Sequence, residues 1–376
     1  MTSDKKIDYR FKILYAVAII MVCCGHTAGG GISIISDWFP YGGMHLALFV
    51  FASGYFYKYA SEEHVGKYIV KKIKTLLVPL YNYNLGYGVI VQILRLRGFE
   101  IGGDFNFTNL IIAPITDGHQ FAYNLGGWFI APLFMVEIYN VLIHKLIHKI
   151  NKDVPEGLFF IINVILGIMG IWLARMGLLS GGWLALVRML YFVPFFGLGV
   201  FYHQVLEKYD RKIPSFWYFG TIFLIKLLIV CYYGKMLSYT PSWCADFTEG
   251  PLIPIINGFL GIAFWMRIVT ILEPVIGRSK WINMVADNTY SIMINQFLGY
   301  MIVKTIYAWA SKVYSGFSDF DWVGYKTNIW WYYMPKELEY TLIVYVVFGI
   351  AFSIAVQKAI DCIKKRVIAV HVKTEC

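Results

Sequence analysis

The chain has 376 residues and carries 33 basic against 23 acidic side chains, which gives a formal net charge of +10. Hydrophobic residues make up 58% of it and charged residues only 15%, whereas a soluble domain usually carries about 25% charged residues. This composition excludes a disordered protein, a disulfide scaffold and a conventional cytosolic enzyme. The basic residues sit between apolar runs, which favours a role in membrane orientation over nucleic-acid binding.

Ten apolar stretches are each long enough, at roughly 20 residues, to predict a membrane-spanning helix. In chain order they lie near 11–28, 41–59, 75–96, 126–147, 157–175, 182–203, 214–233, 251–270, 286–308 and 338–360. The first follows a basic segment, as the apolar region of a signal peptide does, but the second span comes almost at once, so we predict an uncleaved first helix. The aromatic stretch 313–336 contains several charges, which predicts an interfacial loop.

The charges of the connecting segments predict the orientation. With the N-terminus inside, 23 of the 33 basic residues fall in cytoplasmic segments and 7 in outer loops, which is a strong positive-inside bias. An even number of spans then places both termini in the cytoplasm. The sequence shows no internal repeat and no soluble appendage, so residues 1–376 are expected to form a single all-α membrane domain.

Ionisable residues inside spans are functional candidates because their burial in lipid costs energy. His26 follows Phe11 by about 15 helical residues, or roughly 22 Å, which places it in the outer half of the bilayer. Imidazole exchanges protons near neutral pH, so His26 is either a catalytic base or a core histidine bonded to a neighbouring helix. Lys12 lies close to four turns before His26, on roughly the same helix face. It either belongs to the same site or is a positive-inside anchor.

The second span begins with His45 on its outer side and contains two small residues, Ser53 and Gly54. Small residues let helices approach closely, and this is the interpretation that we favour for Gly54. The segment that follows contains four lysines: Lys67, Lys71, Lys72 and Lys74. Clustered lysines bind either anionic lipid or a phosphorylated ligand, and charge alone does not decide between them.

Glu137 and Arg188 are opposite charges within spans. Either they pair across helices, as buried charges usually do, or one of them lines a polar cavity. Trp128 follows two glycines at the start of the fourth span and is either an interfacial anchor or part of a substrate path. The ninth span, NTYSIMINQFLGYMIV, contains Tyr290 and Asn295, whose polar groups either join helices or line that path.

Motifs of several enzyme classes are missing from the sequence. There is no Walker loop, no GxGxxG after a strand, no HExxH and no GxSxG, which argues against an ATPase, a dinucleotide site, a zinc protease and a serine hydrolase. The six cysteines form no CxxC or Cys/His zinc spacing. We therefore predict no metal site and no permanently bound cofactor.

Several short motifs occur in a fixed order: GH at 25–26, then HLALFVFASGYFY, KKIKTLLVP, GGWFIAPLF, RMLYFVPFFGLG and NTYSIMINQ. With ten spans and an inside N-terminus, this order resembles acyltransferase family 3, bacterial multi-spanning membrane proteins that O-acylate cell-surface polysaccharides. The resemblance covers the chain from about residue 8 to about residue 360. It implies that His26 is the catalytic histidine and that the lysines at 71, 72 and 74 meet an acyl-CoA donor.

The chain departs from the pattern of this family at two places. The family usually has Arg or Lys eleven positions before its histidine, where this chain has Tyr15, and Lys12, one turn away, is the candidate replacement. The family often has a histidine in the ninth-span motif, where this chain has Asn295 and Gln296.

We therefore expect a membrane O-acyltransferase of the bacterial cytoplasmic membrane that uses acetyl-CoA or another acyl-CoA as co-substrate and takes a glycan as acceptor. The expected donor-binding residues are Lys12, Lys71, Lys72, Lys74 and Arg188. The expected substrate path contains His45, Ser53, Trp128, Glu137, Tyr290 and Asn295, with His26 as general base or acyl relay. The alternative is a non-enzymatic polysaccharide exporter or flippase, which consumes no thioester. The glycan, the acyl chain and the oligomeric state stay open.

Overall fold

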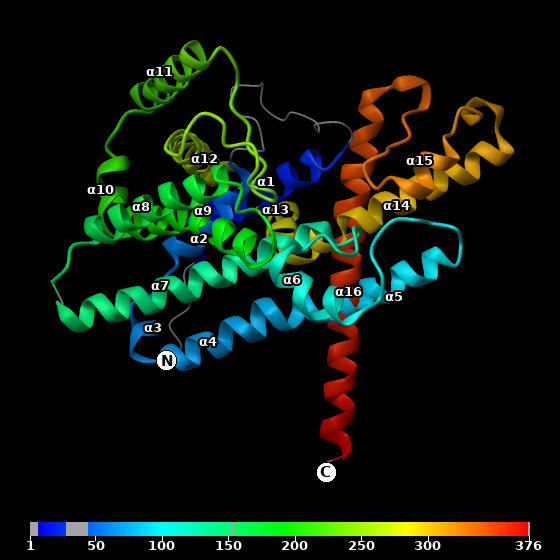
Figure 1. Cartoon of the computed structure of the whole chain (residues 1–376), viewed down its shortest axis with the longest axis horizontal. Helices are drawn as coiled ribbons and strands as arrows, with labels where there is room; N and C mark the ends of the chain where they lie inside the picture. The colour runs from blue at the N-terminus through cyan, green and yellow to red at the C-terminus, as the bar shows by residue number, and fades with distance from the viewer. Residues whose placement is uncertain (1–6, 28–43, 152, 375–376) are drawn as a thin grey trace.

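A computed structural model of the chain describes residues 7–27, 44–151 and 153–374, and this part is helical without any strand (Figure 1). Its α-helices are α1 (Tyr9–Gly25), α2 (His45–Tyr55), α3 (Ala60–Glu63), α4 (Val65–Lys72), α5 (Val78–Arg95), α6 (Ala113–Thr116), α7 (Ile130–Ile150), α8 (Glu156–Arg175), α9 (Gly181–Phe201), α10 (Glu207–Asp210), α11 (Ser215–Tyr233), α12 (Ile253–Ile276), α13 (Lys280–Asp287), α14 (Thr289–Val313), α15 (Trp322–Thr327) and α16 (Leu342–Thr374).

Six helical segments of the described chain are long and apolar enough to cross a membrane. They are Leu125–Ile150, Glu156–Arg175, Gly181–Asp210, Ser215–Tyr233, Ile253–Ile276 and Glu339–Arg366. Each coincides with a predicted span, so the structure confirms an all-α polytopic fold. At the other four positions the helices are shorter or more polar. For example, α2 has 11 residues, or roughly 16 Å, about half the thickness of the hydrocarbon core. The count of ten and the cytoplasmic termini remain predictions.

The basic segment after the second predicted span is continuous with the third. Helix α4 passes through a π-helical turn, Ile73–Leu77, directly into α5. Pro79 stands at the start of α5 and lacks an amide hydrogen, so the regular ladder is interrupted here and the helix widens. Because α4, the π-helical turn and α5 are continuous, Lys67, Lys71, Lys72 and Lys74 belong to the same helical rod as α5.

Helix α1 lies at the centre of the bundle and contacts α2, α12, α13, α14 and α16, while α9 packs on α2, α7 and α8. The crossing of α2 and α9 is close because both helices present glycine there. A Cβ atom on Gly54 would overlap the carbonyl oxygen of Phe196, and one on Gly199 would overlap that of Phe51. Gly54 therefore serves close packing, as the sequence predicts.

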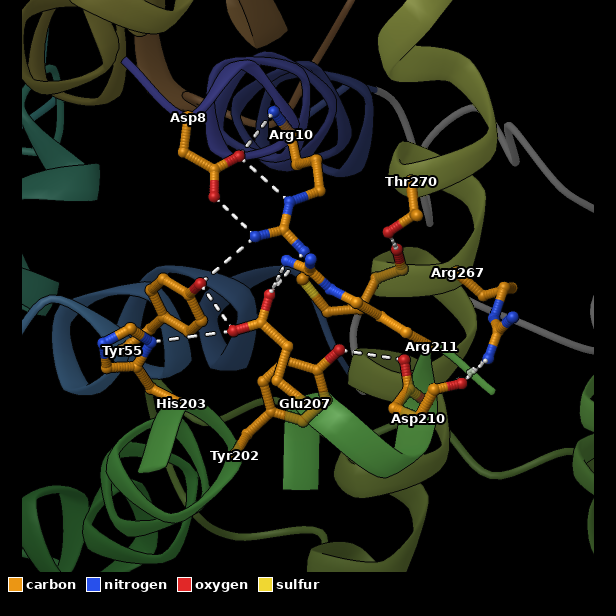
Figure 2. Close-up of polar contacts among 11 residues, drawn as sticks. Asp8, Arg10, Tyr55, Tyr202, His203, Glu207, Asp210, Arg211, Arg267 and Thr270 are labelled. Carbon is orange, nitrogen blue, oxygen red and sulfur yellow. Dashed lines mark hydrogen bonds and ion pairs between the residues drawn. The ribbon is translucent and has the colours of Figure 1, made fainter. Parts of the chain in front are cut away.

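A network of ion pairs joins helices at one end of α1 (Figure 2). The Arg10 guanidinium is 2.6 Å from Asp8 and 2.9 Å from Glu207 of α10. Tyr55, the last residue of α2, donates to Glu207 over 2.8 Å, and Arg211 pairs with the same carboxylate at 2.5 Å. Each charged side chain in this network has a partner of opposite charge. The helices are therefore joined here without leaving an unpaired charge buried in the bundle.

Helices α3 and α4 lie on one side of the molecule, and α15 with the end of α14 lies on the opposite side (Figure 1). These two sides carry the segments that the charge pattern assigns to the cytoplasm and to the outside, respectively. The last turns of α16 extend away from the bundle (Figure 1), and residues 360–366, apart from a partly buried first residue, are exposed.

Candidate active site

His26 stands at the end of α1, where its backbone N–H still bonds the carbonyl of Val22 at 3.2 Å. Its ring packs against Phe297 of α14, with centroids 4.9 Å apart, and against Trp330 at 5.9 Å. The Tyr332 hydroxyl donates to the backbone carbonyl of His26. The ring is therefore fixed from two sides, while its buried Nδ1 has no hydrogen-bond partner among the described residues. A fixed imidazole with a free nitrogen can accept a proton.

His26 opens into a cavity of about 350 Å³, which we call the outer cavity. Its lining comes from the ends of α1 and α2, the turn before α7, helix α14 and two loops far apart in the sequence. The lining residues include His45, Trp128, Trp243 and Trp330, together with the hydroxyl residues Ser238, Thr240 and Ser242. Two predicted path residues, His45 and Trp128, thus lie in one cavity with His26.

Gln296 is the polar residue of α14 that contacts the His26 ring, as a hydrogen-bond partner. Its amide is held in place because its Nε2 donates to the Met293 carbonyl at 3.1 Å and Tyr300 donates to its Oε1 at 3.2 Å. The neighbouring Asn295 points elsewhere and accepts a hydrogen bond of 2.8 Å from Tyr87 of α5. Asn295 therefore joins helices. Neither residue lines the outer cavity, and Gln296 is connected to it only through the His26 ring.

Arg188 of α9 is fully buried and ties together two loops that are far apart in the sequence. Its Nε donates to the carbonyl of Ser242 at 2.9 Å and its Nη1 to the carbonyl of Asp117 at 2.8 Å. The guanidinium also lies 4.8 Å from the centre of the Trp128 ring, an attractive cation–π contact. Arg188 thus shapes the wall of the outer cavity.

A histidine that the sequence did not single out lies in the same loop as Asp117. His119 stacks on Trp243 with ring centroids 4.4 Å apart, and its Nδ1 is 2.9 Å from the Asp117 carboxylate. This hydrogen bond holds the pKa of Asp117 below its ordinary value. The hydrogen bond between His119 and Asp117 therefore helps to hold Trp243, which stacks on His119 and lines the outer cavity.

A second cavity of about 210 Å³, the inner cavity, lies next to the outer one. Phe129 and Met293 line both cavities and so form the partition between them. The inner cavity is also lined by Tyr15, Ser53, Leu76, Tyr290 and Thr289. Two predicted path residues, Ser53 and Tyr290, thus lie here, and so does the tyrosine at the position where the family has a basic residue.

A surface groove of about 580 Å³ lies on the same rod as Leu76 and is lined by Gly66, Lys67, Val70, Lys71, Lys74 and Thr75. We call it the basic groove. Thr75 of the groove and Leu76 of the inner cavity are consecutive in the chain, but they project from different faces of the helix, and the two spaces share no lining residue. Three lysines face one open surface, the arrangement that attracts phosphate.

The remaining predicted donor residue of this segment, Lys72, turns inward. Its Nζ is 2.5 Å from the Glu137 carboxylate of α7, which also accepts a hydrogen bond from Tyr68. The hypothesis that Glu137 pairs with Arg188 is therefore wrong. Arg188 bonds backbone carbonyls at the other end of the bundle instead. Lys12 likewise has a specific partner, Asp287 of α13.

Sequence reasoning missed the residues that the two long loops bring to His26, above all Trp243, Trp330 and Ser242. They lie more than 200 residues away in the chain, and no periodicity marks them. Gln296 had a usable signal, since it stands in the ninth-span motif. His119 had a weaker one, because it is adjacent to a short turn with Asp117.

Residues 8–357 match the model of acyltransferase family 3, which is described as an acyltransferase domain. No curated protein and no solved structure matches the chain. The family match covers nearly the whole chain and includes every helix that lines the two cavities and the groove. On this basis the protein belongs to acyltransferase family 3 and is a multi-pass membrane acyltransferase.

Proposed function

We propose that the protein transfers an acyl group, acetyl in the simplest case, from cytoplasmic acyl-CoA to a hydroxyl of a glycan at the outer face of a bacterial cytoplasmic membrane. The proposal is supported by the placement of three spaces: the basic groove with Lys71 and Lys74 lies one residue before Leu76 of the inner cavity, and the inner cavity shares Phe129 and Met293 with the outer cavity, which His26 lines. Acyl-CoA has a phosphorylated nucleotide that suits the basic groove and a narrow pantetheine arm that suits the smaller cavities.

The donor would bind with its phosphates on Lys67, Lys71 and Lys74, since ammonium groups attract phosphate as point charges. Its pantetheine arm would then follow Leu76 into the inner cavity between Tyr15 and Tyr290. The thioester would reach the partition of Phe129 and Met293. Lys72 has no part in this step, because it is engaged with Glu137.

The acceptor would enter the outer cavity, whose tryptophans offer flat faces for sugar rings and whose loop hydroxyls offer hydrogen-bond partners. His26 would take the proton of the acceptor hydroxyl, and the resulting oxygen would attack the thioester carbonyl carbon. The C–S bond then breaks, and the proton passes to the thiolate of CoA. Gln296 would hold the imidazole in the orientation that this requires.

The test is a comparison of membranes that contain the wild-type chain, His26→Ala or His64→Gln, with acyl-CoA consumption and glycan mass as readouts. His64 is exposed and lies outside both cavities, so His64→Gln is the matched control. We expect His26→Ala to lose at least roughly a hundredfold in transfer rate, the usual contribution of a general base, while His64→Gln keeps full activity. Transfer at the wild-type rate by a well-expressed His26→Ala protein would rule out the base role. Glycan transport without thioester consumption would favour the exporter.

A further inference from the structure

Two histidines and a glutamate form a cluster outside the cavities and the groove. His144 and His148 lie one turn apart on α7, and Glu62 comes from α3. One ligand atom of each residue lies within 4.8 Å of the other two. His148 Nδ1 is 2.8 Å from one Glu62 oxygen, and His144 Nδ1 is 3.8 Å from the other. Two imidazole nitrogens thus face a single carboxylate.

The cluster is incompletely satisfied by hydrogen bonds. At 3.8 Å the His144 nitrogen is too far from Glu62 for a hydrogen bond, and it has no other partner in the described part of the chain. His144 is only 1% exposed, so water does not replace the missing bond, and a buried unpaired polar atom needs an explanation. A divalent cation between the three residues would satisfy both imidazoles and the carboxylate together.

We propose that Glu62, His144 and His148 form a binding site for a transition-metal ion of the zinc type. Imidazole and carboxylate are suitable ligands for Zn²⁺, and two histidines four residues apart on a helix present their rings to one point. Tetrahedral zinc with bonds of about 2.0–2.1 Å separates its ligand atoms by roughly 3.4 Å. The 3.8 Å between His144 Nδ1 and Glu62 is therefore about 0.4 Å longer than such a site requires, and the 2.8 Å between His148 Nδ1 and Glu62 is about 0.6 Å shorter.

The surroundings of the three residues suit a bound ion. Phe159 of α8 stacks on His144 with ring centroids 3.9 Å apart and planes inclined by 10°, which holds that ring in place. Tyr57 donates a hydrogen bond of 3.2 Å to the Glu62 carboxylate, the kind of outer contact that orients metal ligands. The fourth position is left for water. The ion would fasten α3, and with it the start of the rod that carries the basic groove, to α7.

The experiment uses the full-length protein in detergent, purified through a tag without histidines and stripped with a chelator. Co²⁺, whose visible absorption bands report tetrahedral coordination, serves as the spectroscopic probe, and Zn²⁺ is measured by its effect on thermal unfolding. We expect one Co²⁺ per chain in the wild type and a rise in the midpoint of unfolding with Zn²⁺. His148→Gln and Glu62→Gln should each weaken Co²⁺ binding by at least about tenfold and abolish the Zn²⁺ effect.

His64→Gln is the control, because this exposed histidine lies in the same segment but outside the three ligands. It should bind Co²⁺ like the wild type. The side chain of His148 is 22% exposed, so His148→Gln is expected to fold, which gel filtration verifies. An absence of tetrahedral Co²⁺ bands in the wild type would overturn the proposal. So would a folded His148→Gln protein with unchanged Co²⁺ affinity, or an equal loss of affinity in His64→Gln.

Discussion

The guanidinium of Arg188 holds the two loops that close the outer cavity, with Asp117 in one and Ser242 in the other. Lysine has a single ammonium group and cannot reproduce this fork. We expect Arg188→Lys to destabilise the protein by about 2 kcal/mol, since a hydrogen bond to a charged group contributes roughly 1.5–3 kcal/mol. Loop 234–252 should also become sensitive to protease, as limited proteolysis and thermal unfolding will measure.

The control for this experiment is Arg175→Lys. Arg175 makes only a long contact of 3.5 Å to the carbonyl of Thr248 in the same loop, so its replacement should leave the loop protected. If Arg188→Lys loses acyl-CoA binding while loop 234–252 remains protected, Arg188 belongs to the donor path, as the sequence first suggested.

The pair of Lys72 and Glu137 should be coupled energetically. The Glu137 side chain is 4% exposed, so Lys72→Gln leaves a carboxylate without its cation. We expect a double-mutant cycle on the free energy of unfolding to give a coupling of roughly 1–3 kcal/mol for Lys72→Gln with Glu137→Gln. The same cycle for Glu137→Gln with Arg188→Gln should be additive within about 0.5 kcal/mol. The reverse pattern would contradict the contacts described above.

At the scale of elements, the rod formed by α4 and α5 leaves Lys71 and Lys74 exposed at its surface and directs Lys72 toward α7. Lys71→Gln combined with Lys74→Gln should raise the KM for acyl-CoA severalfold, because two charges that attract phosphate are removed. The effect should shrink in high salt, since exposed charges are screened over about 8 Å near physiological ionic strength. Steady-state kinetics at two salt concentrations measure both effects.

The matched control removes two positive charges from exposed positions of α16, Lys364→Gln with Lys365→Gln. It should leave the donor KM unchanged. An equal rise in this control would mean that the effect comes from net charge, and an unchanged KM in the groove variant would identify the groove as a lipid contact.

The crossing of α2 and α9 depends on glycine. Gly54→Ala places a methyl group where the Phe196 carbonyl stands, and backbone on both sides leaves no flexible group to yield. We expect a loss of about 1–3 kcal/mol in the free energy of unfolding. Gly86→Ala on the exposed face of α5 meets nothing within 4 Å and should be neutral or slightly stabilising. Equal unfolding midpoints for the two variants would show that the crossing is loose.

For the whole molecule, the predicted orientation can be tested with single cysteines in a chain whose natural cysteines are replaced by alanine. Asn151 lies in the segment between α7 and α8, which the charges assign to the cytoplasm, and Ala245 lies in the loop before α12, which they assign to the outside; both are exposed. A membrane-impermeant maleimide should label Ala245→Cys in intact cells and Asn151→Cys only after permeabilisation. The opposite labelling would invert the orientation.

Hydropathy predicted the helical architecture well where a span is continuous and apolar, as in α8 and α9. It gave less accurate limits where other forces decide. Helix α2 ends at Tyr55 rather than near 59, at the tyrosine that bonds Glu207. Helix α16 continues to Thr374, well beyond the predicted apolar stretch. The charged and exposed residues of 361–366 lower the hydropathy of this part, so a hydropathy pattern ends before the helix does.

The candidate site was predictable only in part. His26 and Trp128 stand in short motifs, and the structure brings them into one cavity. The partners of the buried charges were not predictable. A charged residue inside a predicted span indicates that it needs a partner, but the sequence does not identify that partner. Glu137 lies about two turns after the cavity-lining residue Phe129 and meets Lys72, while Arg188 lies in the first half of α9 and bonds the loops that contain Asp117 and Ser242. Depth along each helix decided the outcome, and depth depends on tilt and packing that one sequence does not specify.

The partition formed by Phe129 and Met293 has an electrical consequence. Where a water-accessible space enters a membrane protein from each side, the membrane voltage falls mainly across the thin layer that remains between them. A charge that crosses this layer gains or loses about 2.3 kcal/mol for each 100 mV. In the proposed step the acyl group moves outward across this layer while a proton moves inward to the thiolate, so no net charge crosses, whereas a lone proton or a free carboxylate would carry charge through the field. Two hydrophobic side chains would thus let the acyl group pass while keeping the energised membrane insulated against ion leakage.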